Sequence, residues 1–517
     1  MITRVALRLP RISSDLATAV ALLGASGIAA VLQGQDANID LYRYRLYIGY
    51  AFVHQRLDHD FAPAALGTYL NPVLDAFHYL GIVHLPPRVF GFLMGSLQGL
   101  NAVVVLLLAR SLLPNDRGSR LLGLLAALLA ASGPTARSLL GTTLGDTTVS
   151  VPALLALLLL VRGQACPKRG NVALCLVGAG FLGGAAMGLK LTMAPALVAL
   201  ASLVLVGVVR MRIPMGAALA SLAGSVLGYL TVAGYWCWQL WERFGNPIFP
   251  FANQVFRSPY LPAETIRDSR WAAHGVGDYL SPPVDMALGM TERLQEIPFQ
   301  DARWLFVFLA ALAWVGLRLA RRRPPLPPGQ RCLLVYVLVS YAVWGIAFYY
   351  YRYAAVVEFL APLVLVLLIQ AALPKLARPV IIAATILLLL TSSVGSWGRL
   401  AWGERWFNIR LPPQAYEPDS LVLVDSSLSS FLIPYFPGQT RFAGLEGTGS
   451  TRFEELLAAR IAAHRGNLFW LVSRGRPAPS ASPERFGLAV TDDCGVIRTG
   501  EGRWALCRVA RPPGPRT

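Results

Sequence analysis

Two acidic residues, Asp36 and Asp40, follow the first long apolar stretch, in the segment GQDANIDLYRYRLYIGYAF. A spacing of four residues puts both carboxylates on one face if the segment is helical. A carboxylate in this position can act as a general base on a hydroxyl group when burial or a second acid raises its basicity. The alternative is that both acids solvate the end of the apolar stretch or cap the next helix.

Charged residues next to apolar stretches form a second group of candidates. Lys190 interrupts GGAAMGLKLTMAPA, and Arg352 lies in FYYYRYAAVVEFLAP. Such cations can stabilise the charge that grows on a departing phosphate, or they can anchor helix ends at a membrane interface. Glu358, about two turns after Arg352, is expected to face a cavity or a cation such as Arg352 or Arg88, because acids inside apolar helices rarely face lipid.

A polar cluster in HQRLDHD can supply another acid-base group or a loose metal site. Its members are His54, Asp58, His59 and Asp60. Their spacing is poor for metal ligation, so a solvated turn is the favoured interpretation. Asp146, in LGTTLGDTT, is interpreted as a helix N-cap in preference to an acid in the first helical turn.

The six cysteines show no paired C-x-x-C spacing and no clustered histidine partners, so a zinc site has little support. Cys494 and Cys507 lie thirteen residues apart in a segment expected outside the cytoplasm. Disulfides persist in that compartment, and we predict one between these two residues.

Composition predicts that the bilayer is the solvent for most of the chain. The 517 residues are 55% hydrophobic and only 14% charged, with a mean hydropathy of +0.52. Windows long enough to span a ~30 Å hydrocarbon core recur about eleven times. They lie near 16–33, 89–109, 121–135, 147–161, 171–188, 191–209, 213–236, 303–320, 331–350, 353–373 and 379–397.

The distribution of Lys and Arg predicts the orientation. A cytoplasmic N-terminus puts most loop cations on the cytoplasmic side, as the positive-inside rule requires. These are Arg4, Arg8, Arg11, Arg110, Arg117, Arg120, Arg162, Lys168, Arg169, Arg210, Arg212, Arg318, Arg321, Arg322, Arg323, Arg331, Lys375 and Arg378. The opposite short connections carry Arg137, Lys190 and Arg352. The net charge of +18 is therefore a topology signal, and nucleic acid is not an expected partner.

This topology divides the chain into a transmembrane domain, 1–397, and an extracytoplasmic domain, 398–517. The outer segments 34–88 and 237–302 are too long for simple connectors, and we expect the first to fold on the membrane surface with helices near 41–57 and 72–82. After residue 398, LVLVD and NLFWLVS read as strands around a helical FEELLAARIAAH. The expected fold is a mostly α polytopic membrane protein with a small C-terminal α/β domain.

Several phrases resemble membrane glycosyltransferases of the GT-C type, near glycosyltransferase family 87. They are Asp40-Leu-Tyr-Arg-Tyr, LNPVLDAFHYLGI with HLPPRVFGFL, GLKLT, FGNPIFPFANQVFRSP and RYAAVVEFLAPL, which cover most of residues 30–365. The sequence departs from the family after Asp40, where Arg43 and Arg45 stand in place of the more usual Asn and His.

The resemblance implies inverting transfer of a hexose or pentose from a polyprenyl-phosphate donor to a hydroxyl of a glycan, lipid or protein. By position it makes Asp40 the catalytic base, with Asp36 as its neighbour. Lys190, Arg352, Glu358, Arg88 and His54 are then candidates for binding substrate. The resemblance implies no cofactor and does not exclude a divalent metal, and it puts the protein in the inner membrane with its active site on the outer side.

Two other functions fit the same sequence features. A transporter or flippase of lipid-linked saccharides would share the many helices, the interfacial aromatic residues and the few buried charges. A scaffold that recruits envelope partners through residues 398–517 is the third interpretation.

Overall fold

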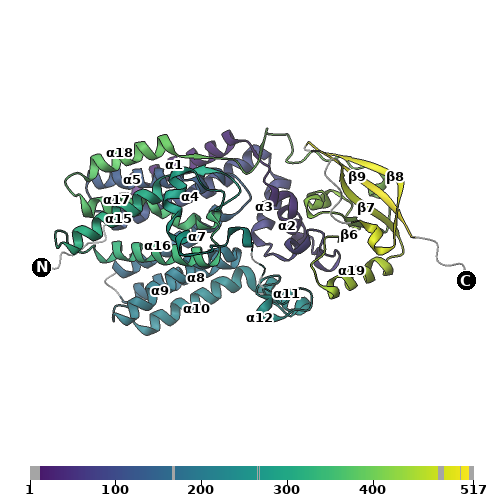
Figure 1. Ribbon diagram of the computed structural model, residues 1–517, viewed down its shortest axis with the longest axis horizontal. Coiled ribbons are helices and arrows are strands. Elements are labelled where there is room, and N and C mark those ends of the chain that lie inside the picture. The colour runs from purple at the N-terminus through teal and green to yellow at the C-terminus, as the bar shows by residue number, and fades with distance from the viewer. Residues whose placement is uncertain are drawn as a thin grey trace, which may run out of the picture. The chain divides into compact units, whose positions relative to one another are not determined.

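The computed structural model of the protein describes residues 12–165, 169–264, 266, 268–474, 482–500 and 502–511. Helices predominate in this part of the chain, and a small sheet forms in the C-terminal region (Figure 1). The chain divides into two compact units. The helical unit comprises residues 1–33, 91–233 and 267–397, and the sheet unit comprises residues 34–90, 234–266 and 398–517. The boundary expected between residues 397 and 398 is thus one of several boundaries between the units.

Long helices form most of the helical unit. They are α1 (Ile12–Gln33), α4 (Pro87–Leu112), α5 (Arg117–Ala131), α7 (Asp146–Ala165), α8 (Arg169–Leu189), α9 (Ala194–Val209), α10 (Met215–Tyr229), α15 (Arg303–Leu319), α16 (Pro328–Ala347), α17 (Ala355–Ala372) and α18 (Ala377–Thr391). Shorter elements connect them: α6 (Pro134–Ser138), η4 (Leu191–Met193), η5 (Leu230–Gly234), η6 (Ser269–Trp271), α13 (Val276–Leu280), α14 (Pro282–Leu288), η7 (Tyr351–Ala354), and the paired strands β2 (Phe299–Gln300) and β3 (Ser393–Val394).

Eight helical stretches in the described residues are long and apolar enough to cross a membrane. They are Asp15–Gln33, Pro87–Leu112, Asp146–Gln164, Val172–Leu189, Leu191–Val209, Met215–Phe244, Pro328–Ala347 and Tyr351–Ala372. Each coincides with one of the eleven expected spans. At the other three positions α5, α15 and α18 have 15, 17 and 15 residues, or about 22–26 Å at 1.5 Å per residue. The count of eleven therefore stays a prediction.

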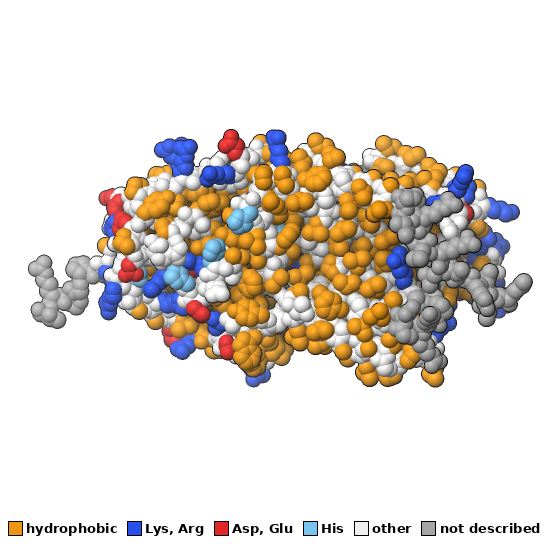
Figure 2. Space-filling view, turned by 180° about the vertical axis from the view of Figure 1, so that it is seen from behind, with side chains coloured by type: hydrophobic (Ala, Val, Ile, Leu, Met, Phe, Trp, Pro, Cys, Tyr) orange, Lys and Arg blue, Asp and Glu red, His pale blue; other side chains and the backbone are white. Residues whose placement is uncertain are grey.

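Exposed apolar side chains on the helical unit agree with a lipid environment. Leu205, Leu219, Leu222, Leu227 and Leu338 are all exposed, and Figure 2 shows hydrophobic side chains spread across one face of the molecule. Water-soluble proteins rarely carry such extensive apolar patches. The orientation stays a prediction, and four of the cations that support it, Arg4, Arg8, Arg11 and Lys168, lie outside the described residues.

Small residues allow α8 and α10 to pack with their backbones in contact. A Cβ atom added to Gly184 would lie 1.9 Å from the carbonyl oxygen of Ser225, and one added to Gly228 would lie 2.0 Å from that of Phe181. Helices in membranes associate through such small-residue faces, because lipid supplies no hydrophobic driving force between them.

The sheet unit combines helices from the two outer segments with the C-terminal sheet. Its elements before residue 398 are β1 (Gln35–Asp36), η1 (Leu41–Arg45), α2 (Leu46–Val53), η2 (Arg56–Asp58), η3 (Ala65–Tyr69), α3 (Val73–His84), α11 (Tyr235–Phe244) and α12 (Asn253–Phe256). The helices expected near 41–57 and 72–82 are therefore confirmed. Between α12 and residue 262 the backbone is irregular but ordered, because the Asn253 amide donates to three carbonyl oxygens, those of Ser258, Leu261 and Pro262.

The C-terminal sheet has the order β6-β5-β7-β9-β8. Its strands are β5 (Ser420–Val424), β6 (Arg441–Gly444), β7 (Asn467–Arg474), β8 (Ala489–Arg498) and β9 (Arg503–Ala510). The other elements are β4 (Arg399–Leu400), η8 (Pro413–Tyr416), η9 (Ser427–Tyr435), α19 (Thr451–Ala463) and η10 (Pro483–Phe486). Strand β5 pairs in parallel with β6 and β7, whereas β9 is antiparallel to β7 and β8. The expected strands in LVLVD and NLFWLVS, and the helix between them, are confirmed.

A buried ion pair attaches the first outer segment to the edge of this sheet. Asp60 accepts hydrogen bonds from Nε and Nη2 of Arg56 at 2.7 Å, from the Tyr47 hydroxyl at 3.0 Å and from the Phe442 amide at 3.1 Å. Burial, reinforced by the nearby charge of Asp60, raises the pKa of Tyr47, so its hydroxyl stays protonated as a donor. A solvated turn is thus the wrong interpretation for Asp60. It holds for Asp58, whose side chain is 83% exposed.

Replacing the buried Asp60 should destabilise the protein far more than replacing the exposed Asp58. We expect Asp60→Asn to lower the free energy of unfolding by about 3 kcal/mol, because it leaves the buried Arg56 guanidinium without its counter-ion. Asp58→Asn is the matched control, and we expect an effect within about 0.5 kcal/mol. Thermal unfolding of the purified protein in detergent measures both, and equal losses would show that Asp60 is no more important than a surface acid.

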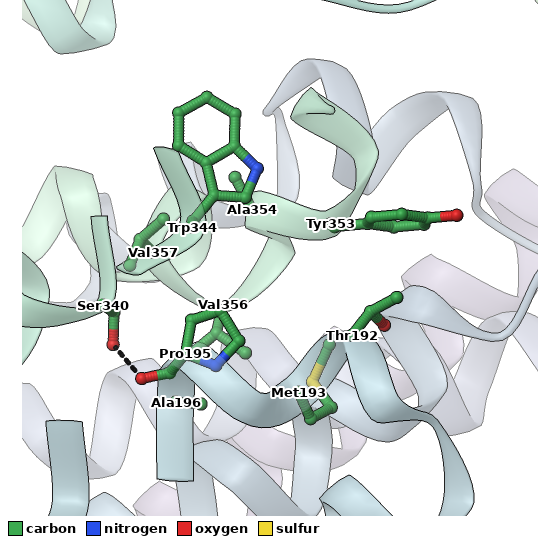
Figure 3. A pocket seen from close by; sticks show the side chains of 10 residues that line it. All are labelled: Thr192, Met193, Pro195, Ala196, Ser340, Trp344, Tyr353, Ala354, Val356 and Val357. Carbon is green, nitrogen blue, oxygen red and sulfur yellow. Dashed lines mark hydrogen bonds between the residues drawn. The ribbon is translucent and has the colours of Figure 1, made fainter. Parts of the chain in front are cut away.

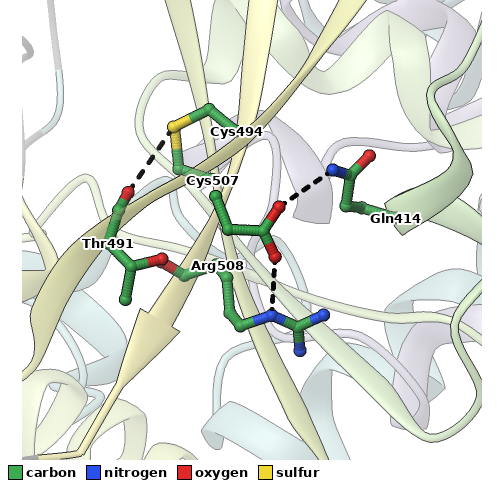
Figure 4. The surroundings of a disulfide bond; sticks show 6 residues. Gln414, Thr491, Cys494, Cys507 and Arg508 are labelled. Carbon is green, nitrogen blue, oxygen red and sulfur yellow. Dashed lines mark hydrogen bonds and ion pairs between the residues drawn. A yellow bond between two sulfur atoms is a disulfide. The ribbon is translucent and has the colours of Figure 1, made fainter.

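The predicted disulfide is present. Cys494 and Cys507 face each other on the antiparallel strands β8 and β9 and are bonded (Figure 4). Beside them, Arg508 Nε donates to Asp493 at 2.9 Å and the Gln414 amide donates to the same carboxylate at 3.0 Å. These contacts fasten the two strands and η8 together.

Reduction of this disulfide should loosen the C-terminal sheet. Closing a loop of 13 residues stabilises a fold by about 3 kcal/mol in the chain-entropy account. We expect the double substitution Cys494→Ser with Cys507→Ser to lower the unfolding temperature and to speed proteolysis between residues 398 and 511. Cys332→Ser, at a cysteine outside the disulfide, is the control and should leave both unchanged.

Candidate functional site

Breaks at the ends of three helices bring the charged residues of the helical unit together. Helix α8 ends at Leu189, and Lys190 adopts an extended conformation with φ −154° and ψ 118°. Pro195 in the first turn of α9 favours a break before it, since its ring would clash with the carbonyl four residues earlier in a continuous helix. Arg352 lies in the 3-10 turn η7 before α17, and Asp146 is the first residue of α7.

Asp146 is the centre of this cluster. Its fully buried carboxylate accepts a hydrogen bond of 2.6 Å from Lys190 Nζ and lies 3.3 Å from Arg352 Nε. Lys190 Nζ also donates to the carbonyl oxygen of Leu144 at 3.0 Å. The expectation that Asp146 is an N-cap is wrong, because the helix begins at Asp146 itself. The alternative, an acid in the first helical turn, is correct. It did not predict the contacts with Lys190 and Arg352.

Aromatic rings complete the surroundings of the two cations. The Arg352 guanidinium lies 4.9 Å from the ring centre of Trp397 and 5.2 Å from that of Tyr350. Lys190 and Arg352 both lie over the ring of Tyr353, at 5.4 and 5.5 Å. The side chains of Lys190 and Arg352 are only 16% and 9% exposed, so water screens their positive charges weakly. An anion that reached these two side chains would interact with them strongly.

A small, mainly apolar pocket adjoins the cations through Tyr353. Figure 3 shows its lining side chains, which are Thr192, Met193, Pro195, Ala196, Ser340, Trp344, Tyr353, Ala354, Val356 and Val357. They come from η4, α9, α16, η7 and α17. Ser340 donates to the carbonyl oxygen of Pro195 at 3.3 Å, which leaves the rest of the lining mostly hydrocarbon. Cations beside apolar side chains suit an amphipathic anion.

Glu358 has a different environment from the one expected. Its carboxylate is fully buried and accepts hydrogen bonds from the backbone amides of Thr135 at 3.1 Å and Ala136 at 3.0 Å, at the start of α6. The cation that interacts electrostatically with it is Arg303, which is also paired with Asp301 at 2.7 Å. The structure therefore gives Glu358 the cation Arg303, where Arg352 or Arg88 was expected. These contacts give Glu358 a role in holding the turn between α5 and α6.

Asp36 is buried and stabilises the turn at the start of the first outer segment. Both of its carboxylate oxygens accept from the Asn38 amide group, at 2.9 and 2.8 Å, and the Asn38 side chain in turn accepts from the Leu41 amide at 3.0 Å. Strand β1 pairs with β4, so Asp36 lies opposite Arg399. Burial lowers the pKa of Arg399, and the negative charge of Asp36 opposes that effect. Asp36 thus fixes the start of η1.

Asp40 immediately precedes η1, and its side chain is 16% exposed. The turn is held from the C-terminal region by Ser430 of η9, whose hydroxyl lies 3.2 Å from the carbonyl oxygen of Tyr42 and 2.7 Å from that of Arg43. The Tyr42 ring packs edge-on against Phe407 and Phe431. Residues nearly 400 positions away in sequence therefore position the segment that carries Asp40.

The remaining candidates lie elsewhere in the sheet unit. His54, at the end of α2, is exposed and hydrogen-bonded to the Tyr79 hydroxyl at 3.1 Å, and Arg88 is exposed in the first turn of α4. Sequence reasoning missed Arg45, Asp75 and His78 as a charged group. The spacing of Asp75 and His78, three residues apart in an otherwise apolar helix, was an available signal.

Neither protein-family models nor characterised proteins match this chain. Among the described residues, no group of three or more His, Cys, Asp or Glu side chains is arranged to hold a metal ion. The contacts of the site itself are therefore the basis for its function.

Removing the charge of Asp146 should make the stability of the protein depend on an added anion that can take its place beside Lys190 and Arg352. We expect Asp146→Asn to lower stability by about 3 kcal/mol, since two little-exposed cations lose the carboxylate that they share. Inorganic phosphate should then raise the unfolding temperature of this variant more than that of the parent protein. Sodium chloride at equal ionic strength and Asp268→Asn, an exposed acid paired with Arg270, are the controls. An equal response of both proteins to phosphate would contradict the anion-site assignment.

Proposed function

We propose that the protein is a membrane glycosyltransferase that transfers a sugar from a polyprenyl-phosphate donor to an acceptor hydroxyl on the extracytoplasmic side. The observation that carries the proposal is the cation pair Lys190 and Arg352 beside an apolar pocket at the break between two candidate spans. A lipid-linked phosphate combines the two properties that this arrangement favours, an anionic head and a hydrocarbon tail.

The two cations have a defined task in such a reaction. As the bond between the anomeric carbon and the phosphate oxygen breaks, the electron pair stays on the phosphate, and its charge grows. Fixed cations in a setting of low dielectric stabilise this charge more in the transition state than in the ground state. Lys190 and Arg352 are held in place by Asp146 and by aromatic rings, so little reorganisation is needed when the charge develops.

Asp40 is the proposed general base. It takes the proton of the acceptor hydroxyl as the acceptor oxygen attacks the anomeric carbon from the side opposite the phosphate. The products are the inverted glycoside, polyprenyl phosphate and a protonated Asp40, which then releases its proton to water. The low exposure of Asp40 and the rigid turn that carries it support this role. Asp36 supports the same turn through Asn38.

The disulfide between Cys494 and Cys507 supports an extracytoplasmic location for residues 398–517, since disulfides persist in oxidising compartments. That location agrees with a cytoplasmic N-terminus, a plasma (inner) membrane site and an acceptor in the cell envelope. The proposed reaction uses no nucleotide cofactor.

The test is sugar transfer by purified protein in lipid vesicles, with a panel of polyprenyl-phosphate pentoses and hexoses and extracted envelope glycans as acceptors. We expect Asp40→Asn to lower kcat/KM by about a thousandfold through loss of the base. Arg352→Gln and Lys190→Gln should lower kcat by about a hundredfold through loss of leaving-group stabilisation. Asp58→Asn and Arg293→Gln, changes at exposed residues, are the controls.

The outcome also separates the enzyme from the flippase. A flippase would move labelled lipid-linked sugar across the vesicle membrane without forming a glycosidic bond, and Asp40→Asn would leave that movement intact. Transfer that persists in Asp40→Asn would reject Asp40 as the base.

A further inference from the structure

Trp344, in the last turn of α16, is bonded to the backbone just before Arg352. Its indole Nε1 atom donates to the carbonyl oxygen of Tyr350 at 2.8 Å. The Trp344 side chain is only 1% exposed, so water cannot readily replace this donor. A buried carbonyl oxygen that loses its donor is costly, and the bond therefore restrains the main chain at Tyr350.

The chain between α16 and η7 has a strained conformation that Trp344 helps to hold. Tyr349 has a φ of +55°, in the left-handed region that bulky residues rarely adopt. The amides of Phe348 and Tyr349 both donate to the carbonyl oxygen of Trp344 at 2.9 Å. The rings of Tyr349 and Trp344 stack with 5.7 Å between their centres and 17° between their planes. Such strain persists only where the surrounding contacts determine it, and it is common at functional sites.

Tyr351, the residue immediately before Arg352, is fixed by three further contacts. Its amide donates to the carbonyl oxygen of Leu294 at 2.9 Å, and its ring stacks on that of Phe299 with 4.8 Å between the centres. Its hydroxyl accepts a hydrogen bond of 3.1 Å from Trp304 Nε1. The main chain is thus held at two consecutive residues before Arg352, which leaves the position of Arg352 little freedom.

Trp344 is also one of the residues that line the apolar pocket (Figure 3). Tyr353, another lining residue, has the Arg352 guanidinium 5.5 Å from its ring centre. The same tryptophan therefore contributes its ring to the pocket wall and its N–H to the backbone that carries the cation. These two roles can be separated by substitution, because a phenylalanine keeps an aromatic ring and lacks the donor.

We propose that Trp344 is a positioning residue, whose indole N–H fixes the backbone before Arg352 and so sets where the guanidinium meets the donor phosphate. This inference rests on the proposed role of Arg352 in sugar transfer. Arg352 lies beside Asp146, and it stabilises the leaving phosphate best if it does not have to move as the charge grows. Trp344 acts through the main chain of η7 and not through contact with the phosphate.

Trp344→Phe should lower kcat and leave the KM of the lipid donor nearly unchanged. We expect kcat to fall about tenfold, since one buried hydrogen bond that positions a charge is worth about one power of ten in rate. KM should change by less than about twofold, because the pocket keeps an aromatic wall and the lost stabilisation belongs mainly to the transition state. Steady-state kinetics of purified protein in lipid vesicles measures both values.

Trp236→Phe is the matched control, because Trp236 is also a buried tryptophan whose indole donates to a backbone carbonyl oxygen, that of Tyr69, at 2.9 Å. We expect its kcat to stay within about twofold of the parent value. In an Arg352→Gln background Trp344→Phe should cause no further loss, since it acts through Arg352. Equal losses in the two tryptophan variants, or a full additional loss in the Arg352→Gln background, would overturn the positioning role.

Trp344→His tests the donor itself. The Nε2 atom of histidine lies at the same place along its ring as the indole nitrogen, so this variant can restore an N–H near the Tyr350 carbonyl oxygen. We expect it to keep more of kcat than Trp344→Phe does. A histidine variant no faster than the phenylalanine variant would show that the hydrogen bond is not what Trp344 contributes.

A second measurement needs no sugar transfer and separates this inference from the proposed reaction. Decyl phosphate, like the departing polyprenyl phosphate, carries about two negative charges at neutral pH. Its binding to purified protein can be measured by calorimetry, with decanol as the uncharged comparison. We expect Arg352→Gln to weaken binding about tenfold and Trp344→Phe about fivefold, with the double variant equal to Arg352→Gln.

The combined results distinguish failure of the positioning role from failure of the proposed function. If the parent protein transfers no sugar but binds decyl phosphate with these differences, the proposed function fails and the positioning role stands. If the parent transfers sugar and Trp344→Phe binds decyl phosphate as the parent does, the positioning role alone fails. A parent protein that neither transfers sugar nor binds decyl phosphate would reject both.

Discussion

One buried negative charge, that of Asp146, determines how the helical unit is arranged around its polar centre. An ionised carboxylate without exposure to water is very costly unless cations and hydrogen-bond donors surround it. Lys190 and Arg352 meet that requirement, and they come from the break after α8 and the turn before α17. If either cation moved away, the buried carboxylate would lose part of its stabilisation. The pairs therefore hold three helix ends together. The apolar pocket that Tyr353 lines is formed by residues that follow two of these breaks, together with residues of α16.

The sheet unit shows a comparable dependence of a local segment on distant residues. The turn around Asp40 receives hydrogen bonds from Ser430, and the segment that follows it is anchored by Asp60 to the amide of Phe442. Residues of the C-terminal region therefore have a structural role in the first outer segment. They fix the conformation of the first outer segment, including its π turn η1, which begins directly after the proposed base.

The proposed function rests on chemistry and not on kinship, because no known family matches the chain. Two cations beside an apolar pocket favour a lipid-linked anion, and a little-exposed aspartate on a rigid turn favours proton abstraction. Each arrangement alone has other uses, such as anchoring a helix end or moving a lipid across the membrane. In the proposed glycosyl transfer the cations act on the leaving phosphate and the aspartate acts on the acceptor hydroxyl.

The sequence alone determined the membrane class of the protein, the positions of eight spans, the small C-terminal sheet and the disulfide. Hydropathy, strand alternation and cysteine spacing are local properties, so they can be read from neighbouring residues. Only the tertiary structure showed that Asp146 pairs with Lys190 and Arg352, that Glu358 lies with Arg303, and that Asp75 holds Arg45. These pairs join residues 30 to more than 200 positions apart, and no local pattern specifies which buried charge will meet which. Their choice depends on where helices break and how closely they pack, which the completed fold decides.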